Sequence, residues 1–194
     1  MFNQQLKKNK TIIAPTILIS IFAVMFSNSA LAWNHEIAAG YGYGKEVEQD
    51  YDNSGFEITG KFFKFPPIDN TLIFTLDGTV AHWRSNTPNN NQLTIAAIAP
   101  NARAYFFNPC YNTVRPYIGV SFGPAYLSQR QLGNREQGSH FAFQTTLEGG
   151  TEIQLRNNHS LDLNLHLAHY CNAGLAKPNQ GIDVLYIFTV GYQF

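Results

Sequence analysis

Hydrophobic and polar residues alternate along most of the chain, in segments separated by clusters of Gly, Pro, Asn and Asp. Alternation over a short segment predicts a β-strand with one apolar face, and the intervening clusters predict turns. We count eight such segments. They cover residues 34–44, 56–65, 71–84, 92–107, 115–128, 140–155, 161–171 and 182–194.

The connections between these segments differ in length and polarity. Residues 66–70, 108–112 and 156–160 form compact turns, whereas residues 45–55 and 130–139 form longer, more polar loops. Short turns at one end and long loops at the other are typical of an outer-membrane barrel. We therefore predict an all-β fold, an eight-stranded antiparallel up-and-down outer-membrane β-barrel. Side chains fill a barrel of this size, so we expect no pore.

The last segment carries an unbroken apolar and aromatic face that ends on the terminal residue. Its members alternate along the sequence: Val184, Tyr186, Phe188, Val190, Tyr192 and Phe194. Such a face resembles the C-terminal signal by which bacterial outer-membrane barrels are recognised for insertion. We therefore expect the barrel-assembly machinery to recognise Phe194. The alternative is a half-buried strand of a soluble β-sandwich.

The sixth and seventh segments show which faces should meet lipid and which should point inward. Leucines share the expected lipid face of the seventh segment: Leu161, Leu163, Leu165 and Leu167. Polar residues share its other face: Asp162, Asn164 and His166. On the sixth segment Glu148 and Glu152 point inward, where they can form a polar network with Arg103. A narrow packed barrel must satisfy its interior polar groups, so we interpret this network as structural.

The N-terminal region has the pattern of a secretory signal peptide. Three lysines precede an apolar run over residues 11–26, and small residues follow at Ala30 and Ala32. A transmembrane anchor is the alternative, but the run is short for one. We expect residues 1–32 to be a cleaved signal peptide and residues 33–194 to form a single transmembrane barrel domain.

Composition excludes some classes of function. Only 13% of residues are charged and the formal net charge is zero, so there is no electrostatic case for nucleic-acid binding. Most histidines are scattered over separate segments and do not form a metal-binding set. These are His35, His82, His140, His159 and His166. We expect neither a metal nor a cofactor.

The stretch that begins at His169 places reactive groups on a membrane-facing strand. After Leu167, the next outward positions of the seventh segment are His169 and Cys171. Eight strands put both chain ends in the periplasm, so these residues lie in the outer leaflet, where lipopolysaccharide sits. Residues i and i+2 of a strand are close enough for a histidine to withdraw the proton of a thiol nucleophile. Asp183, across the connecting loop, can orient the imidazole.

Two observations bear on whether these residues can act together. Simple alternation gives Asp183 the same parity as Leu185 and Ile187, which points it inward, so a bulge or the loop geometry must turn it outward. The loop also contains Asn179 and Gly181, whose carboxamide and backbone N–H are donor types that stabilise an oxyanion. Asn172 is a further support residue in this loop. The group suits acyl transfer from a lipid ester.

The two cysteines raise the question of a disulfide. Cys110 falls in an expected periplasmic turn, whereas Cys171 falls near the opposite rim. The apolar band of an outer-membrane barrel is about 25 Å tall, and a disulfide requires Cα atoms within about 7 Å. We predict that Cys110 and Cys171 are not bonded to each other.

The stretches His169-Tyr170-Cys171-Asn172-Ala173-Gly174 and Pro178-Asn179-Gln180-Gly181-Ile182-Asp183 resemble the lipid A 3-O-deacylases of Gram-negative outer membranes, the PagL family. The resemblance implies an eight-stranded barrel that hydrolyses the ester at the 3-position of lipid A with a His–Ser–Glu triad. It gives His169 the role of base and Asn179 the role of oxyanion donor. Cys171 stands in place of the serine, and Asp183 in place of the glutamate.

The resulting hypothesis is an outer-membrane esterase, of the lipid A 3-O-deacylase type, acting on lipid A or lipopolysaccharide. Catalysis rests on His169, Cys171 and Asp183, with Asn179 and Gly181 as oxyanion donors. Outer-membrane lipids are expected neighbours, nucleic acid is not a partner, and a homodimer is left open. The alternative is a non-catalytic small outer-membrane barrel, structural or adhesive, with a decayed deacylase site.

Overall fold

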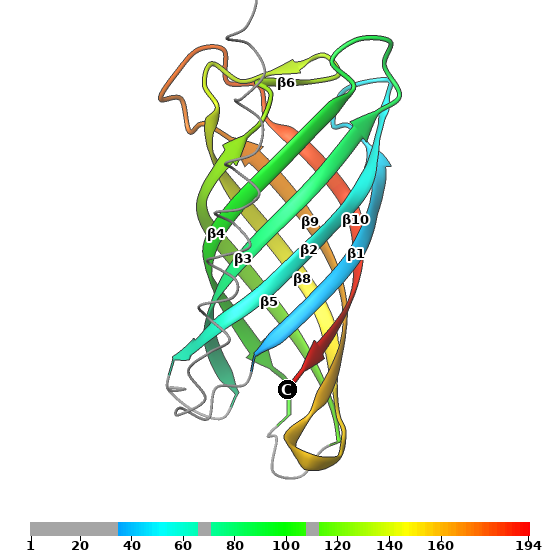
Figure 1. Cartoon of the computed structure of the whole chain (residues 1–194), viewed down its shortest axis with the longest axis vertical. Coiled ribbons are helices and arrows are strands. Elements are labelled where there is room, and N and C mark those ends of the chain that lie inside the picture. Colours follow the sequence, from blue (N-terminus) through cyan, green and yellow to red (C-terminus); the bar gives the residue numbers. More distant parts are fainter. Residues whose placement is uncertain (1–34, 66–70, 108–112) are drawn as a thin grey trace, which may run out of the picture. The chain divides into compact units, whose positions relative to one another are not determined.

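Eight antiparallel strands close into a barrel (Figure 1). The computed structural model describes residues 35–65, 71–107 and 113–194. Around the barrel the order is β1-β10-β9-β8-β5-β4-β3-β2. The barrel strands are β1 (Glu36–Lys45), β2 (Asp52–Phe65), β3 (Leu72–Ser85), β4 (Gln92–Tyr105), β5 (Val114–Leu127), β8 (Phe141–Gln154), β9 (Ser160–Cys171) and β10 (Ile182–Gln193). The predicted fold class is confirmed.

The connections differ from expectation in two places. Because β1 runs to Lys45 and β2 starts at Asp52, the first outer loop is shorter than the predicted 45–55. The predicted loop 130–139 contains a small hairpin of β6 (Gln131–Leu132) and β7 (Arg135–Glu136). Figure 1 shows this hairpin at the end of the barrel opposite the C-terminus.

Of the three predicted compact turns, the structure describes one. A short 3-10 helix, η1 (Arg156–Asn158), forms the turn between β8 and β9. The predicted turns at 66–70 and 108–112, and the predicted signal peptide at 1–32, lie outside the described residues. Among the described residues, no helix has the length and apolar character needed to cross a membrane.

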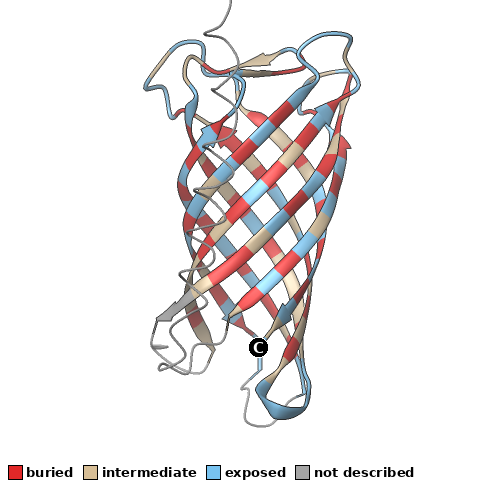
Figure 2. Ribbon diagram, viewed as in Figure 1, coloured by how far each residue is buried: buried red, intermediate tan, exposed pale blue. Residues whose placement is uncertain are grey.

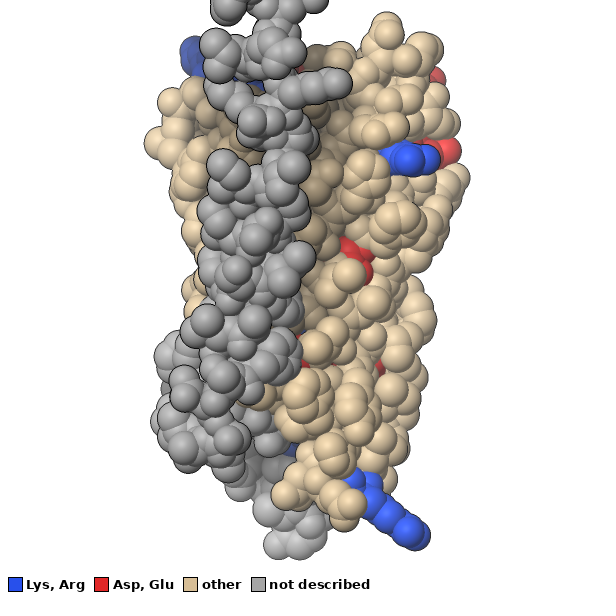
Figure 3. Space-filling model, viewed as in Figure 1, with Lys and Arg blue, Asp and Glu red and all other residues tan. Residues whose placement is uncertain are grey.

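Burial alternates residue by residue along the strands, as Figure 2 shows. In β5, nearly every second side chain is buried and the ones between are exposed. The exposed positions carry large apolar side chains, among them Ile118, Val120, Phe122, Leu147, Leu165 and Phe188. The face in Figure 3 carries few charged side chains on its described surface. This is the pattern of a strand with one side in lipid and the other inside a barrel.

The barrel interior is filled in layers. Apolar side chains occupy the end that carries the β6–β7 hairpin, and among them Trp83, Leu93, Leu127 and Leu132 are fully buried. Polar and charged residues occupy the middle of the interior around a cavity of about 40 Å³. A cavity of this volume has room for only a few water molecules.

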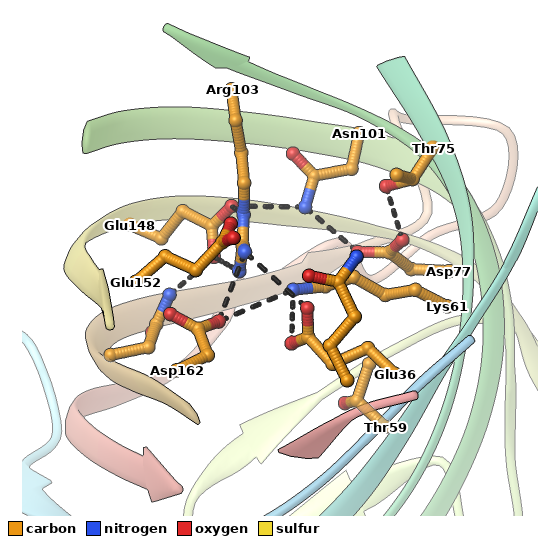
Figure 4. Close-up of polar contacts among 12 residues, drawn as sticks. Glu36, Thr59, Lys61, Thr75, Asp77, Asn101, Arg103, Glu148, Glu152 and Asp162 are labelled. Carbon is orange, nitrogen blue, oxygen red and sulfur yellow. Dashed lines mark hydrogen bonds and ion pairs between the residues drawn. The ribbon is translucent and has the colours of Figure 1, made fainter. Parts of the chain in front are cut away.

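Arg103 is the centre of the charged layer (Figure 4). Its guanidinium Nε and Nη2 donate to Glu148 at 2.8 and 3.0 Å, and its Nη1 lies 2.9 Å from Asp162. Lys61 lies 2.6 Å from Glu36 and 3.5 Å from Asp162. The predicted network of Arg103 with Glu148 is therefore confirmed, and buried opposite charges compensate one another there.

Glu152 belongs to a second group of contacts, nearer the turn end of the barrel. It accepts a hydrogen bond from the Tyr105 hydroxyl at 2.7 Å and pairs with Arg115. The Arg115 guanidinium also lies over the Tyr105 ring, 4.6 Å from its centroid. The expectation that Glu152 joins the Arg103 network was wrong, because its ion-pair partner is Arg115. Glu152 does point into the interior, as predicted.

A bulge in β10 changes which way its first residues face. The pairing of β10 with β9 shifts between Val184 and Ile187, and Tyr186 has a φ of 59°. The extra residue on β10 reverses the alternation on its N-terminal side. Val184, predicted on the outer aromatic face, is consequently buried. The rest of that face, from Tyr186 to Phe194, is exposed as predicted.

Replacing Arg103 tests the charged layer. Arg103→Leu leaves buried carboxylates without their cation, so we expect the free energy of unfolding to fall by about 3–5 kcal/mol. Urea titration in detergent micelles, followed by gel migration of folded and unfolded barrel, measures it. Arg84→Leu on the exposed side of β3 is the control, with an expected change within about 0.5 kcal/mol. Equal stability of both variants would contradict the structural role of the network.

Candidate active site

The bulge brings Asp183 to the outer face, beside His169. The two residues are direct register partners on the neighbouring strands β10 and β9. Asp183 Oδ1 lies 2.8 Å from His169 Nδ1, and the side chains are 18% and 40% exposed. A carboxylate held on one ring nitrogen fixes the imidazole and leaves Nε2 to act on another group. The sequence prediction required either a bulge or the loop geometry to turn Asp183 outward, and the structure contains a bulge.

Cys171 lies on the same strand face as His169, two residues further along β9. Both are half-buried, and Cys171 is a free thiol close enough to the imidazole to interact with it. The predicted absence of a bond to Cys110 concerns a residue outside the described part of the chain. The structure thus brings together the three predicted residues His169, Cys171 and Asp183 at the barrel end opposite Phe194.

Gly181 packs directly against the imidazole. A Cβ atom added to Gly181 would lie 2.2 Å from His169 Cε1, far inside van der Waals contact. Only glycine therefore allows the backbone to approach the ring this closely. Gly181, which the sequence suggested as an oxyanion donor, therefore lies beside the imidazole of His169.

The loop between β9 and β10 is organised by Asn172. This residue is fully buried, and its side chain binds the loop backbone: Nδ2 donates to the carbonyl of Ala176 at 2.8 Å, and Oδ1 accepts from the N–H of Gly174 at 3.0 Å. Its backbone N–H donates to Asn179 Oδ1 at 3.0 Å. Asn172 is therefore engaged in support, while the exposed Asn179 keeps its Nδ2 as the donor it can offer.

The third outer loop holds the β9–β10 loop in place, which sequence reasoning missed. Gln137 is fully buried, and its Oε1 accepts from the N–H of Asn172 at 3.1 Å while Nε2 donates to the carbonyl of Gln180. Glu136 N–H donates to Gln180 Oε1 at 2.9 Å, and Gln180 N–H donates back to the Glu136 carbonyl at 3.1 Å. Loops have no hydrophobic period, so no signal in the sequence marks Gln137.

The described residues contain no group of three or more His, Cys, Asp or Glu side chains arranged to hold a metal ion.

The family model described as lipid A 3-O-deacylase (PagL) matches residues 62–193, which is more than half of the chain. The chain belongs to the PagL family. The match includes His169, Cys171, Asn179, Gly181 and Asp183. The resemblance seen in the sequence is therefore confirmed at the level of the family.

Individual relatives agree with the family. The lipid A deacylase PagL of Pseudomonas aeruginosa is 30% identical over 77 residues, which cover 40% of this chain and 42% of that protein. The matched part thus spans less than half the length of this relative. A solved structure of the outer membrane enzyme PagL superposes with a TM-score of 0.59 at 21% identity, covering 81% of this chain and 97% of the other.

Neisserial surface protein A has the same fold, with a TM-score of 0.55 at 15% identity and coverage of 82% of this chain and 94% of the other. At such identities the superpositions establish the fold alone. Together with membership of the PagL family, the fold makes the chain an integral β-barrel protein of the Gram-negative outer membrane, as predicted.

The reactivity of Cys171 tests whether His169 acts on the thiol. In a Cys110→Ser background, we expect iodoacetamide to alkylate Cys171 about tenfold more slowly at neutral pH after His169→Ala, since the thiolate is the reacting species and its base is removed. Mass spectrometry of the intact protein follows the reaction. His82→Ala, a histidine on β3 that contacts Thr94, is the matched control. An unchanged rate in His169→Ala would show that the imidazole does not act on the Cys171 thiol.

Proposed function

We propose that this PagL-family barrel is an esterase that removes the ester-linked 3-hydroxyacyl chain from the 3-position of lipid A. The observation that carries the proposal is the 2.8 Å contact between His169 and Asp183 on the outer face of the barrel, with Cys171 beside it. Polar side chains on a lipid-facing surface are costly and mark functional sites. The substrate class follows from the family and from the lipid that such a face contacts.

In the first step His169 Nε2 withdraws the proton of the Cys171 thiol. The thiolate attacks the ester carbonyl, and a tetrahedral intermediate forms. When the C–O bond breaks, the acyl group stays on Cys171 as a thioester. The proton on the imidazole passes to the oxygen of the departing sugar hydroxyl. Asp183 orients the ring and stabilises its charged form, but it keeps its own charge.

In the second step a water molecule hydrolyses the thioester. His169 withdraws a proton from the water, whose oxygen attacks the acyl carbonyl. The C–S bond breaks, the fatty acid leaves, and the proton returns from the imidazole to the Cys171 sulfur. The mechanism balances without a metal or a redox group, so the proposed enzyme needs no cofactor.

Asn179 and Gly181 are the proposed donors to the oxyanion of both tetrahedral intermediates. Support comes from two contacts described above. The Asn179 carboxamide is anchored through its oxygen, which leaves its N–H groups as donors, and the Gly181 backbone touches the His169 ring. Preorganised donors of this kind lower the barrier by about 2.7–4 kcal/mol each.

The nucleophile distinguishes this chain from the pattern that the family resemblance implies. Cys171 stands at the position of a serine, and Asp183 at the position of a glutamate. The shorter aspartate still reaches the imidazole, because the bulge places it directly across from His169. The thiol is therefore the element whose competence decides between an active esterase and a barrel with a decayed site.

Incubation of the purified barrel with lipid A in detergent tests the proposed reaction. We expect mass spectrometry to show the loss of one 3-hydroxyacyl chain, and Cys171→Ala to abolish the loss because it removes the nucleophile. Cys171→Ser separates the two chemistries: higher activity than the parent identifies the thiol as the impaired element. No loss of an acyl chain across several detergents would contradict the proposal and favour the non-catalytic barrel.

Gly181→Ala tests the packing of the loop against the imidazole. The added methyl group displaces the ring from its position between Cys171 and Asp183, so we expect deacylation to fall about a hundredfold. The free energy of unfolding should change little, because the displaced ring is half exposed. Gly149→Ala on β8 is the control, because an added Cβ there meets only the Tyr117 carbonyl, at 4.0 Å. Full activity in Gly181→Ala would refute this geometry.

Two further predictions accompany the proposed function. Residues 1–32 are a signal peptide removed on export, with residues 33–194 as the mature domain. The barrel-assembly machinery recognises the C-terminal face that ends at Phe194. A homodimer in the membrane is left open. Cross-linking in isolated membranes and N-terminal sequencing of the purified protein test these points.

A further inference from the structure

Asp183 lies beyond the end of one of its two strand ladders. Its partner in β9 is His169, but on the other side the β1–β10 pairing ends at Gly42 and Ile187. The backbone N–H and carbonyl of Asp183 that face this side consequently have no strand to pair with. Unpaired backbone groups away from water are costly, so other groups must satisfy them.

Two side chains from the opposite side of the gap take the place of the missing strand. Asp183 N–H donates to the carboxylate of Glu46, at 3.2 Å from Oε1 and 3.3 Å from Oε2. Asn53 Nδ2 donates to the carbonyl of Asp183 at 2.9 Å. The same Nδ2 donates to Glu46 Oε2 at 2.6 Å, which links the two side chains. Together they reproduce the donor and acceptor of a paired strand residue.

Burial shows that Glu46 is not an ordinary loop residue. It follows directly after β1, yet its side chain is 0% exposed. Glutamate is almost never fully buried unless it is paired. Arg135 of β7 brings its Nε to 3.6 Å from Glu46 Oε1, so the first outer loop, β2, β10 and the outer hairpin meet behind Asp183.

We propose that Glu46 and Asn53 are positioning residues that hold the backbone of Asp183 so that its carboxylate faces His169. The proposal rests on the function proposed above and deepens it. Neither residue touches the reacting atoms. Both act through Asp183, because the bulge that turns this residue outward also takes it away from β1.

The charge of Glu46 supplies a second readout. Burial raises the pKa of Glu46 to about 7, against hydrogen bonds from Asp183 N–H and Asn53 and the charge of Arg135, which lower it. The other charged or titratable groups that face it are the Asp183 carboxylate and the Tyr51 hydroxyl, and Glu48 lies beyond Arg135. Between about pH 4.5 and 7, Glu46 is ionised in the unfolded chain but still largely protonated in the folded protein. The free energy of unfolding therefore falls as pH rises through this range.

Glu46→Gln follows from these contacts as the test. The variant keeps one acceptor for Asp183 N–H but places an N–H₂ group opposite the Asn53 donor. The contacts of Glu46 and Asn53 with the Asp183 backbone are therefore weakened. In a Cys110→Ser background, we expect about a tenfold fall in the rate of Cys171 alkylation and in kcat for lipid A, with KM little changed. At about pH 8 the variant should unfold at no lower urea concentration than its parent, because it no longer buries a charge.

Glu48→Gln is the matched control. It lies in the same loop, makes the same change of charge, and its side chain is 83% exposed. We expect both rates to stay within about twofold of the parent. Asn53→Asp, which removes both donated hydrogen bonds, should repeat the loss seen in Glu46→Gln.

A double variant decides whether Glu46 acts through Asp183. After Asp183→Asn, a further Glu46→Gln should leave the alkylation rate unchanged, because the orienting carboxylate is already absent. An additive loss, or an unchanged rate in Glu46→Gln alone, overturns the proposal. Alkylation does not depend on lipid turnover. A barrel that cleaves no lipid A but shows the alkylation pattern therefore refutes the esterase and retains the positioning role.

Discussion

Closure of the sheet is the constraint on which the molecule depends. Once eight strands pair into a barrel, each strand residue faces either lipid or the interior, and the period of two leaves no third choice. Charged residues therefore gather inside, where Arg103 and Lys61 compensate the carboxylates around them. Under this constraint a polar group on the outer face costs free energy, because lipid cannot solvate it. His169 is such a group.

The candidate site exists because β10 departs from the regular inward–outward alternation of its side chains. The bulge in β10 turns Asp183 outward and buries Val184, so that two neighbouring strands present an acid and a base side by side. The same departure breaks the pairing with β1, and the side chains of Glu46 and Asn53 occupy the gap. A local irregularity in the backbone and the polar residues behind it thus belong to one arrangement.

Much of this arrangement could be predicted from the sequence, for identifiable reasons. Alternation determined the strands, and parity along the seventh segment assigned His169 and Cys171 to the lipid face. The same parity pointed Asp183 inward, away from the site, so either a bulge or the loop geometry had to turn it outward. The position of the bulge was not predictable, because Val184 is apolar and suits either face. Gln137 and Glu46 also escaped prediction. Glu46 binds Asp183 across 137 positions of sequence, and loop residues carry no period that reveals such contacts.

The direction in which the site opens has a consequence for how molecules reach it. The interior is closed by side chains, and the imidazole and thiol face outward from the barrel wall. A lipid ligand of these groups can reach them by diffusing sideways within one leaflet, without crossing bulk water. Occupancy then depends on the mole fraction of that lipid in the leaflet and on the fluidity of the surrounding chains. In the proposed reaction, the released fatty acid enters the same leaflet from which its parent lipid came.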